Sequence, residues 1–228
     1  MNTVAIITAR GGSKRIPKKN IKVFLGKPII AYSIEIAIDS KLFDRVIVST
    51  DSDEITEVAA HYGAEIPFKR PAELADDYAG TDEVLIHALR WLEGNDRAYD
   101  YACCIYPTVP MLRVEYVKKG LEMLKKTGAT SAFSVTTYPY PISRSLKINK
   151  QGRLEKYWSG YVDARSQDLE EAYHDAGQFY WVSVDKYLKE KRILSPDSVP
   201  VAIKRYLVQD IDTPEDWEMA EKLYQLSQ

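Results

Sequence analysis

Short apolar runs alternate with amphipathic segments along the first 135 residues of the chain. Runs that are apolar at nearly every position are typical of strands buried on both faces of a parallel sheet, and they lie at 4–9, 46–50, 101–106 and 132–136. Helical spacing of apolar positions occurs at 28–41, 81–93 and 114–126. A further helix is expected to end at His61, with Asp51 or Ser52 as its cap. This order predicts an α/β fold with a doubly wound, mostly parallel sheet.

The pattern changes after residue 137. The segment Tyr138-Pro139-Tyr140-Pro141 interrupts it, and 146–154 predicts a hairpin around Lys150-Gln151-Gly152. Aromatic residues then become frequent up to Trp181, and they are Tyr157, Trp158, Tyr161, Tyr173, Phe179 and Tyr180. We expect a small inserted β-rich lobe at about 138–175, within a single domain spanning 1–228. The aromatic side chains favour a subunit interface, and packing against the main core is the alternative.

The C-terminal part returns to the earlier pattern. Residues 205–211 predict a further strand, with Ile211 pointing into the core. Thr213 followed by Pro214 and early acidic residues predicts the start of a last helix.

Composition limits the possible classes of protein. The chain has 228 residues, 45% of them hydrophobic and 28% charged, which suits one domain with a sizeable core. A net charge of −2 gives no global sign of a nucleic-acid or membrane partner, and no apolar run approaches the ~20 residues of a membrane span. The start of the chain does not resemble a signal peptide, and Cys103 and Cys104 are adjacent and set in an apolar run. We expect buried thiols and a cytoplasmic protein.

A basic loop with two glycines directly follows the first predicted strand. Six lysine and arginine residues surround Gly11 and Gly12, at the strand end where open α/β sheets bind ligands. The glycines let backbone N–H groups approach phosphate oxygens, and Arg10, Lys14 and Lys19 suit a triphosphate. The spacing matches neither a Walker A motif nor G-x-G-x-x-G. The loop therefore predicts phosphate binding, with a solvated basic loop as the alternative.

Two aspartates near the C-terminus form the second candidate feature. If 205–211 is a strand, Asp210 and Asp212 lie on the same face of its end, because side chains two apart share a face. Two carboxylates so close repel unless a cation lies between them, and Mg²⁺ prefers oxygen ligands shared with phosphates. No cluster of histidine and cysteine offers a zinc site instead. In the alternative interpretation, Asp212 only caps the last helix and Asp210 is exposed.

Several segments together resemble the CMP-sialic acid synthetase family. They are A-R-G-G-S-K-R-I-P-K-K-N at 9–20, R-P-A-E-L-A-D-D at 70–77, Y-P-T-V-P at 106–110 and D-I-D-T-P-E-D at 210–216, in the family's order along essentially the whole chain. Within the family, Y-P-T-V-P, R-S-Q-D-L at 165–169 and A-Y-H-D-A-G-Q-F-Y-W at 172–181 are most similar to members that activate pseudaminic acid. The resemblance implies a Rossmann-like core and a homodimer in which the lobe reaches across to the partner.

The resemblance also implies roles for individual residues. In the basic loop, which includes Gly11, Gly12 and Ser13, the positions that bind CTP phosphates are Arg10, Lys14, Lys19 and Asn20. Arg70 and Thr81 match positions that line the nucleotide pocket near the base, and Asp210 and Asp212 match the metal-binding pair. Arg144 and Arg165 lie in the lobe where the family binds the sugar carboxylate.

Tyr106 and His174 bear on the sugar. Tyr106 stands where the neuraminic acid enzymes have Gln in a Q-P-T-S-P segment, which argues against N-acetylneuraminate and favours pseudaminate. His174 is a candidate sugar contact, with structural packing as the alternative. His61 and His87 lie on helical patterns and are expected at the surface or at its boundary.

The implied reaction transfers CMP from CTP to the anomeric hydroxyl of a nonulosonic acid and releases pyrophosphate. Arg10, Lys14 and Asp212 are the expected catalytic residues, with Mg²⁺ as cofactor, because no side chain stands out as a general base. The alternatives are synthetases for N-acetylneuraminate, legionaminate or 3-deoxy-manno-octulosonate. A different class of alternative is a CTP-binding module without catalysis, which the intact pair of aspartates disfavours.

Overall fold

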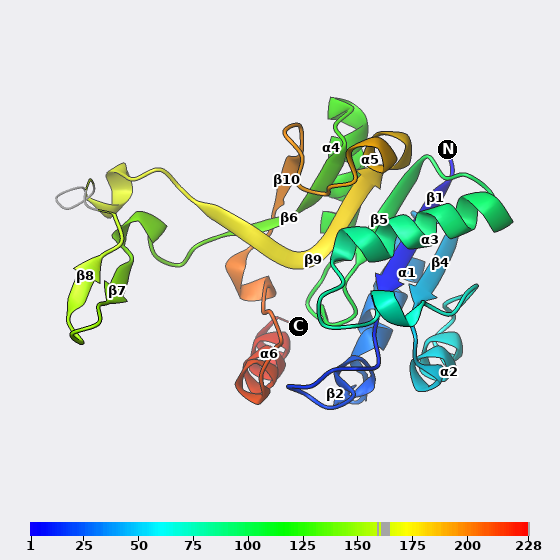
Figure 1. The fold of residues 1–228 in the computed structure, drawn as a ribbon, viewed down its shortest axis with the longest axis horizontal. Coiled ribbons are helices and arrows are strands. Elements are labelled where there is room, and N and C mark those ends of the chain that lie inside the picture. Colours follow the sequence, from blue (N-terminus) through cyan, green and yellow to red (C-terminus); the bar gives the residue numbers. More distant parts are fainter. Residues whose placement is uncertain (159, 161–164, 228) are drawn as a thin grey trace.

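The computed structural model describes residues 1–158, 160 and 165–227. Its centre is a six-stranded sheet with helices packed on both faces (Figure 1). The strands of this sheet are β1 (Thr3–Thr8), β4 (Arg45–Ser49), β5 (Tyr101–Ile105), β6 (Ser131–Thr137), β9 (Tyr173–Ser183) and β10 (Val199–Ala202). The helices are α1 (Ile29–Ser40), α2 (Asp53–His61), α3 (Thr81–Asn95), α4 (Val114–Thr127), α5 (Val184–Glu190) and α6 (Pro214–Leu226). No helix in this described part of the chain is long and apolar enough to cross a membrane.

The strand order is β10-β6-β9-β5-β1-β4. Strand β1 pairs in parallel with β4 and β5, and β10 pairs in parallel with β6, whereas β9 is antiparallel to both of its neighbours. The predicted α/β class and the mostly parallel sheet are therefore confirmed. The chain passes from β1 outward to β4 and then crosses to β5 on the other side of β1. A crevice for a ligand is expected where the connections diverge in this way.

Both faces of the sheet are buried, which explains the continuous apolar runs. In β1, Ala5 and Ile7 belong to the core cluster under α1, α2 and α4, whereas Val4 and Ile6 belong to the cluster under α3 and α5. Successive side chains of a strand point to opposite faces, so each face needs its own set of apolar residues. A third, smaller cluster joins α6 and the start of α1 to the short hairpin of β2 (Val23–Phe24) and β3 (Lys27–Pro28).

The strands and helices expected in the first 137 residues are confirmed within one or two residues at each end. Helix α2 is capped by Ser52, whose side chain accepts a hydrogen bond from the Ile55 N–H. Thr213 caps α6 with Pro214 in its first turn, as predicted.

The strand predicted at 205–211 is wrong. A short 3₁₀ helix, η6 (Arg205–Leu207), occupies its start, and residues 208–212 follow an irregular path. Leu207 and Ile211 are buried as the pattern suggested, but they enter two different core clusters. The apolar residues Leu207 and Ile211 therefore pack into the core at two separate places and do not share one face of a strand. The argument that placed Asp210 and Asp212 on one strand face fails with it.

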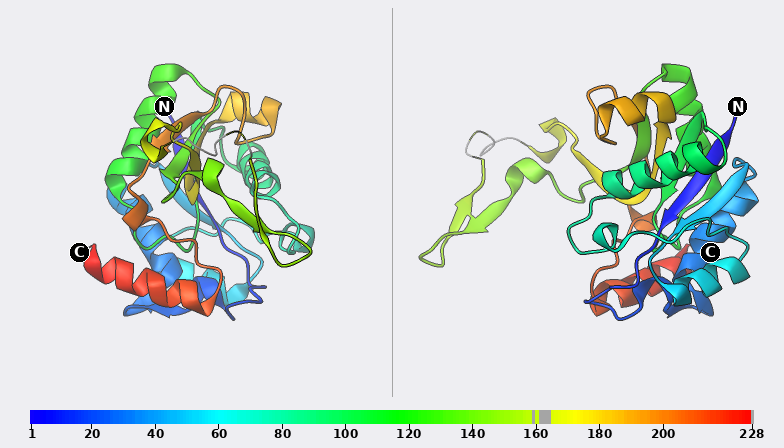
Figure 2. Two further views of the ribbon diagram at one scale, coloured as in Figure 1. Left: turned by 90° about the vertical axis from the view of Figure 1, so that its left-hand side faces the viewer. Right: turned by 45° about the vertical axis from the view of Figure 1, so that its right-hand side comes forward.

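The segment after β6 leaves the body of the molecule and carries a projecting hairpin (Figures 1 and 2). It begins with the 3₁₀ helix η3 (Ile142–Arg144). Strands β7 (Leu146–Ile148) and β8 (Leu154–Lys156) then pair antiparallel, which confirms the predicted hairpin, and a 3₁₀ helix, η5 (Ser166–Asp168), precedes β9. Residues 159 and 161–164, which include Tyr161, lie outside the described residues.

The aromatic residues of this region divide between two environments. Tyr157 and Trp158 are exposed on the lobe, at 60% and 42%. Phe179, Tyr180 and Trp181 are buried in β9, which enters the centre of the main sheet. Tyr173, at the start of β9, is 48% exposed. The hypothesis of an interface therefore remains for Tyr157, Trp158 and Tyr173, and core packing accounts for the other three.

We predict that Gly120→Ala destabilises the fold where α4 crosses β9. A Cβ at this position would lie 2.7 Å from Trp181 Cδ1 and 2.9 Å from Phe179 Cε2, and both rings are fully buried. Overpacking of this kind costs about 1–3 kcal/mol in the free energy of unfolding, to be measured by chemical denaturation. Gly94→Ala in α3 is the control, because its Cβ would meet nothing within 4 Å. Equal stability of the two variants would contradict the tight packing of α4 against β9.

Candidate active site

A pocket of about 330 Å³ opens at the carboxyl ends of β1 and β5. Segments far apart in the sequence form its walls, because parallel strands bring the loops that follow them to one edge of the sheet. The predicted site residues that line it are Arg10, Ser13, Lys14, Lys19, Asn20, Arg70, Thr81, Tyr106, Asp210 and Asp212. The structure thus brings together the basic loop, the two aspartates and residues from three further segments.

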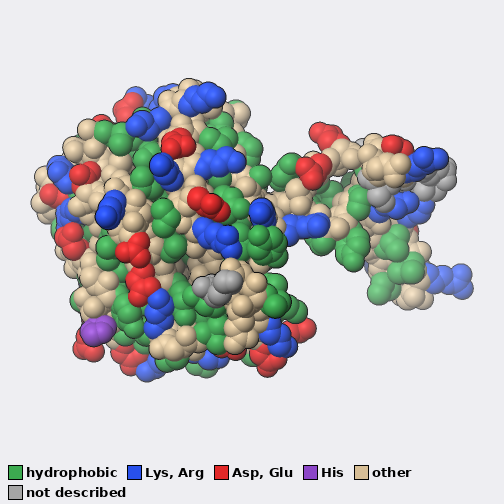
Figure 3. All heavy atoms as spheres, turned by 180° about the vertical axis from the view of Figure 1, so that it is seen from behind, with side chains coloured by type: hydrophobic (Ala, Val, Ile, Leu, Met, Phe, Trp, Pro, Cys, Tyr) green, Lys and Arg blue, Asp and Glu red, His purple; other side chains and the backbone are tan. Residues whose placement is uncertain are grey.

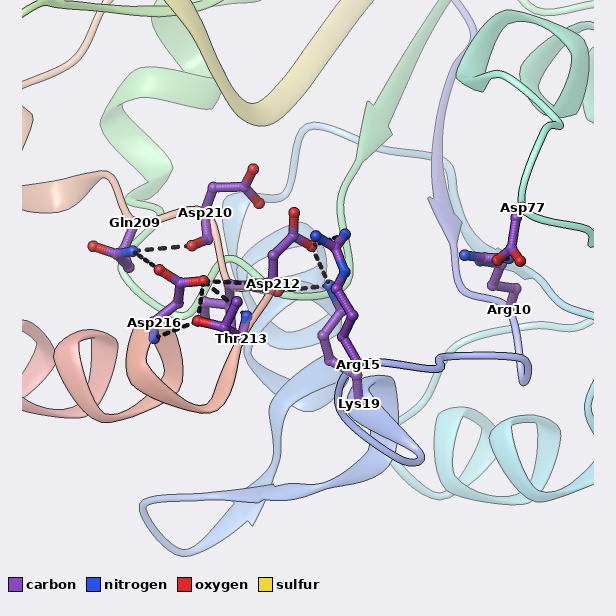
Figure 4. Close-up of polar contacts among 10 residues, drawn as sticks. Arg10, Arg15, Lys19, Asp77, Gln209, Asp210, Asp212, Thr213 and Asp216 are labelled. Carbon is purple, nitrogen blue, oxygen red and sulfur yellow. Dashed lines mark hydrogen bonds and ion pairs between the residues drawn. The ribbon is translucent and has the colours of Figure 1, made fainter. Parts of the chain in front are cut away.

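Asp77 holds the two cations at one end of the pocket. Arg10 lies against Asp77 (Figure 4) and donates to its Oδ1 at 2.7 Å. Arg10 also donates to the Asp76 carbonyl at 2.8 Å, and Lys14 forms an ion pair with Asp77 Oδ2. Hydrogen bonds from Lys14 and then from Arg10 lower the pKa of the Asp77 carboxyl below its usual value. Asn20 fixes the loop from behind, because its side-chain amide donates to the Arg10 carbonyl at 2.9 Å. A phosphate entering here would compete with one carboxylate for two cations.

The two glycines of the loop do not line the pocket. The Gly11 N–H donates to Asp51 Oδ1 at 2.9 Å, so this amide is engaged by the turn after β4. A Cβ at Gly11 would lie 3.0 Å from Ser52 Cβ, whereas one at Gly12 would meet nothing within 4 Å. Gly11 therefore permits the close approach of two loops, and Gly12 lies in open space.

Asp212 lies between two cations at the other end of the pocket. Its Oδ1 is 2.9 Å from Arg15 and 3.3 Å from the Lys19 ammonium, which also donates to the Ile211 carbonyl at 2.6 Å (Figure 4). The interpretation that Asp212 caps the last helix is wrong, since Thr213 occupies that position. Asp216 instead accepts the Asp212 N–H at 3.1 Å and so fixes its backbone.

The carboxylate of Asp210 is not compensated in this way. Among the described residues, no hydrogen bond or ion pair reaches its side chain, and only its backbone carbonyl accepts one, from Gln209. Asp210 is exposed, as the alternative interpretation expected. The protein around it still partly desolvates the carboxyl and the Asp212 carboxylate repels it, and both effects raise the pKa of Asp210. The pocket therefore contains one unpaired carboxylate, which is the environment that a cation would stabilise.

A divalent metal fits this donor set only in part. Within the described ranges, no three acidic, histidine or cysteine side chains are grouped as they would be around a metal held by protein alone. Asp210 and Asp212 could therefore supply two oxygen ligands, with the others coming from water and a bound phosphate. This sharing is typical of Mg²⁺ sites.

Arg70 is a buried cation at the floor of the same pocket. It is 5% exposed, and its side chain donates to the hydroxyl and the carbonyl of Ser49 at the end of β4. Burial is the main reason that the pKa of the guanidinium falls to about 10, which leaves it charged near neutral pH. Because the Arg70 side chain is already fixed, it would lose little conformational entropy on binding an anionic or polar ligand.

A second pocket, of about 440 Å³, adjoins the first and shares Thr81 and Tyr106 with it. The hydroxyls of these two residues are 2.5 Å apart, so they form a bonded pair between the two pockets. Burial is the main cause that raises the pKa of Tyr106, so its hydroxyl stays protonated. The remaining lining residues are mostly apolar or aromatic, and they are Asp82, Phe133, Val135, Tyr173, His174, Asp175, Tyr180, Ile193 and Leu194.

The three other predicted residues lie apart from the first pocket. His174 lines the second pocket, where its ring packs 4.8 Å from that of Tyr138 and its Nδ1 is 2.8 Å from the Asp175 carbonyl. Arg144 and Arg165 belong to the projecting lobe and line neither pocket.

The remaining histidines lie where the helical patterns placed them. His61 is exposed at the end of α2, and His87 is half-buried on α3, next to the ring of Phe68.

Sequence reasoning missed several residues of these pockets. Arg15 was counted only as one cation of the basic loop, although it pairs with Asp212. Asp77 lies in a segment that carried the family resemblance, but nothing in its sequence context pointed to the loop more than sixty positions earlier. Tyr180 donates to Asp175 at 2.9 Å on the wall of the second pocket, and only the position of β9 in the sheet reveals this contact.

Several known proteins are similar to this chain over its whole length. A protein from Campylobacter jejuni subsp. jejuni serotype O:2, named pseudaminic acid cytidylyltransferase, is 43% identical over 227 residues, which cover 100% of this chain and 98% of the relative. A CMP-N,N'-diacetyllegionaminic acid synthase from Legionella pneumophila is 34% identical, again over 100% and 98% of the two chains. A solved structure of CMP:2-keto-3-deoxy-manno-octonic acid synthetase complexed with CTP has the same fold, with a TM-score of 0.72, 16% identity and full coverage of both chains.

A family model described as cytidylyltransferase matches residues 4–227, which is nearly the whole chain. Both the match and the full-length relative at 43% identity extend across every segment that lines the two pockets. The chain therefore belongs to the cytidylyltransferase family.

Proposed function

We propose that this enzyme transfers CMP from CTP to the anomeric hydroxyl of pseudaminic acid and releases pyrophosphate. The observation that carries the proposal is the single crevice in which the basic loop, Arg70 and the Asp210–Asp212 pair meet beside a second, largely apolar pocket. The first pocket offers cations for a triphosphate, and the second is adjacent to it, as two reacting substrates require.

The choice of sugar rests on two supports. The relative at 43% identity is named for pseudaminic acid, and the Legionella relative is named for a diacetylated nonulosonic acid. In addition, Phe133, Val135 and Ile193 give the second pocket buried apolar walls. Such walls suit methyl and acyl groups better than a chain of hydroxyls, which would lose hydrogen bonds to water on entry. N-acetylneuraminate, legionaminate and 3-deoxy-manno-octulosonate remain the alternative sugars.

The residues of the first pocket would act mainly by positioning and by charge. Arg10 and Lys14 would exchange Asp77 for the phosphates of CTP and then stabilise the pyrophosphate as it leaves. Lys19 and Arg15 would hold Asp212 in place. Lys19 and Asn20 would keep the loop closed around the nucleotide, and Arg70 with Thr81 would line the pocket near the base.

Mg²⁺ is the proposed cofactor. Asp210 and Asp212 would be its protein ligands, because one carboxylate is unpaired and the other lies beside it at the mouth of the pocket. When bound there, the ion would polarise the α-phosphate and favour deprotonation of the sugar hydroxyl.

We predict that pseudaminic acid is the preferred sugar in a pyrophosphate-release assay with CTP. Pseudaminic acid should give the highest kcat/KM, at least ~10-fold above N-acetylneuraminate, because an apolar wall discriminates against added hydroxyl groups. The panel includes legionaminate and 3-deoxy-manno-octulosonate. A higher value for any of these three sugars would contradict the assignment of the sugar. CTP binding with no pyrophosphate release from any sugar would instead indicate a binding module without catalysis.

We predict that Asp212→Ala lowers kcat at least ~10²-fold, since it removes one of the two proposed protein ligands of Mg²⁺. The measurement is steady-state turnover at saturating CTP and Mg²⁺. Glu215→Ala is the matched control, because Glu215 is an exposed carboxylate on the first turn of α6 that lines neither pocket. Near-normal turnover of Asp212→Ala would eliminate the metal role of this residue.

We also propose that the enzyme is a homodimer held by the projecting lobe. Leu146, Ile148 and Leu154 share one face of the β7–β8 hairpin and are 53%, 73% and 72% exposed. Figure 3 shows hydrophobic side chains on this lobe, apart from the main body. A two-stranded hairpin is barely stable alone, so an apolar face of this kind needs a partner, and a second copy is the one that the family resemblance implies. Arg144 and Arg165, on the same lobe, would then approach the partner's sugar pocket.

For this dimer we predict that Ile148→Glu produces monomers, because a charge would be buried in the contact. Sedimentation velocity should give a dimer for the unmodified chain and a monomer for the variant. Leu226→Glu, at a residue that is 84% exposed on α6, should remain dimeric. A monomeric unmodified chain would refute the proposal outright.

We place the enzyme in the cytoplasm as a further part of the proposal. Cys103 and Cys104 support it, because both are fully buried free thiols within β5, and burial raises the pKa of each.

A further inference from the structure

Strand β9 bends sharply where it passes β6 (Figure 1). The pairing changes from Phe133–Tyr180 to Val135–Asp175, so residues 176–179 face a single residue of β6, Ser134. The Ser134 hydroxyl closes this bulge, because it accepts the N–H groups of both Gln178 and Phe179 at 3.2 Å. Bulges next to binding sites commonly redirect a side chain.

The side chain redirected here is that of Gln178. It is 3% exposed, and its amide nitrogen donates to the Leu207 carbonyl at 2.6 Å. The oxygen of the same amide is buried and has no hydrogen-bond partner among the described residues. An apolar side chain of equal size would fill this space without leaving an acceptor unpaired. Packing alone therefore does not account for a glutamine at this position, whereas its bond to Leu207 does.

Leu207 begins the segment that carries the two aspartates of the pocket. Residues 208–212 belong to no strand or helix, so no ladder of hydrogen bonds fixes them. The downstream end is anchored by the buried Ile211, whose carbonyl accepts from Lys19, and by Asp216. The upstream end is anchored by the buried Leu207 side chain and by the bond from Gln178 to the Leu207 carbonyl.

Asp210 lies between these two anchors, and no contact to its own side chain holds it in place within the described structure. Its position over the pocket therefore depends on where the two ends are fixed. The backbone carbonyl of Gln178 accepts the Tyr106 N–H at 3.0 Å, so the same residue also contacts Tyr106, which lines the pocket.

We propose that Gln178 is a positioning residue. It fixes the position of the Asp210–Asp212 segment relative to Tyr106 and so relative to the nucleotide pocket. It acts through the Leu207 carbonyl and does not touch the substrates. The proposal rests on the proposed metal role of the two aspartates. The test is therefore built around metal binding and includes a readout that does not depend on turnover.

The test variant is Gln178→Met, which keeps the length and volume of the side chain but cannot donate a hydrogen bond. Residues that orient metal ligands typically change metal affinity by ~10-fold or more when they are replaced. We expect a similar rise in the Mg²⁺ concentration that half-saturates pyrophosphate release, with little change in KM for CTP at saturating metal. Electron paramagnetic resonance of Mn²⁺ in the presence of CTP should give the same loss of affinity without catalysis.

Thr136→Val is the matched control. The Thr136 hydroxyl is also buried, on the neighbouring strand β6, and it donates to the Ile203 carbonyl at 2.9 Å, upstream of η6. The control loses the same kind of hydrogen bond to the same stretch of chain, so its thermal midpoint should fall by a similar amount. Its Mg²⁺ and Mn²⁺ half-saturation should equal that of the unmodified enzyme.

Gln178→Glu is the conservative variant. A buried carboxyl that faces a carbonyl oxygen stays protonated near neutral pH and can donate the missing bond. We expect its metal half-saturation to lie close to that of the unmodified enzyme. If it were as weak as that of Gln178→Met, the effect would come from packing and the proposal would be overturned.

Two further outcomes decide against the proposal. Unchanged metal half-saturation in Gln178→Met overturns it, as does an equal shift in Thr136→Val. If Gln178→Met does not fold, Gln178→Asn replaces it under the same criteria, since its amide is one methylene too short to reach Leu207. Turnover of the unmodified enzyme without divalent metal, together with no Mn²⁺ binding, would instead refute the metal role of Asp210 and Asp212. Mn²⁺ binding by the unmodified enzyme that is equally strong in Gln178→Met would refute only the positioning role of Gln178.

Discussion

Charge compensation inside one narrow crevice is the constraint on which the rest of the site depends. The loop after β1 places several cations within a few residues, and such a cluster repels itself unless anions lie between its members. Asp77 balances Arg10 and Lys14 at one end, and Asp212 balances Arg15 and Lys19 at the other (Figure 4). The loop is therefore held in shape by carboxylates that come from distant parts of the chain.

This arrangement is the basis of the proposed triphosphate site. The Asp77 carboxylate contacts Arg10 and Lys14, the two cations proposed to bind the phosphates, so a nucleotide bound there would exchange one set of ion pairs for another. Asp210 is the exception, since its carboxylate is unpaired and its pKa is raised by desolvation and by Asp212. Two cations therefore contact each of Asp77 and Asp212, whereas the Asp210 carboxylate has no cation against it among the described residues.

The antiparallel strand β9 connects this charged pocket to its apolar neighbour. Asp175 and Tyr180, on the two sides of the bulge in β9, lie on the wall of the second pocket. The bulge in the same strand turns Gln178 toward Leu207, below the segment of the aspartates. The bonded pair of Thr81 and Tyr106 separates the two pockets. Two binding regions with opposite chemical character therefore share one rigid strand and one pair of hydroxyls.

The strongest sequence predictions came from local patterns with a direct physical cause. Apolar runs predicted β1, β4, β5 and β6 because each strand is buried on both faces. The capping candidates, Asp51 or Ser52 for α2 and Thr213 for α6, predicted where two helices begin, since free N–H groups at a helix start need an acceptor. Arg10, Lys14 and Lys19 do line the pocket, but Gly11 and Gly12 do not, and phosphate binding by this loop stays a prediction. The pattern at 205–211 misled, because the same apolar spacing can serve two separate anchors.

By itself, the sequence determined the α/β class and the position of the basic loop at the end of the first strand. The pairing of Asp210 with Asp212 rested on the family resemblance, because residues 208–212 form no strand that would align them. Only the tertiary structure decided that Asp77 holds Arg10 and Lys14, that Arg15 pairs with Asp212, and that β9 runs antiparallel through the centre of the sheet. Apolar periodicity and capping depend on neighbours a few residues away, which a sequence displays directly. Ion pairs and strand order depend on which distant segments meet, and that is fixed by the packing of the whole core.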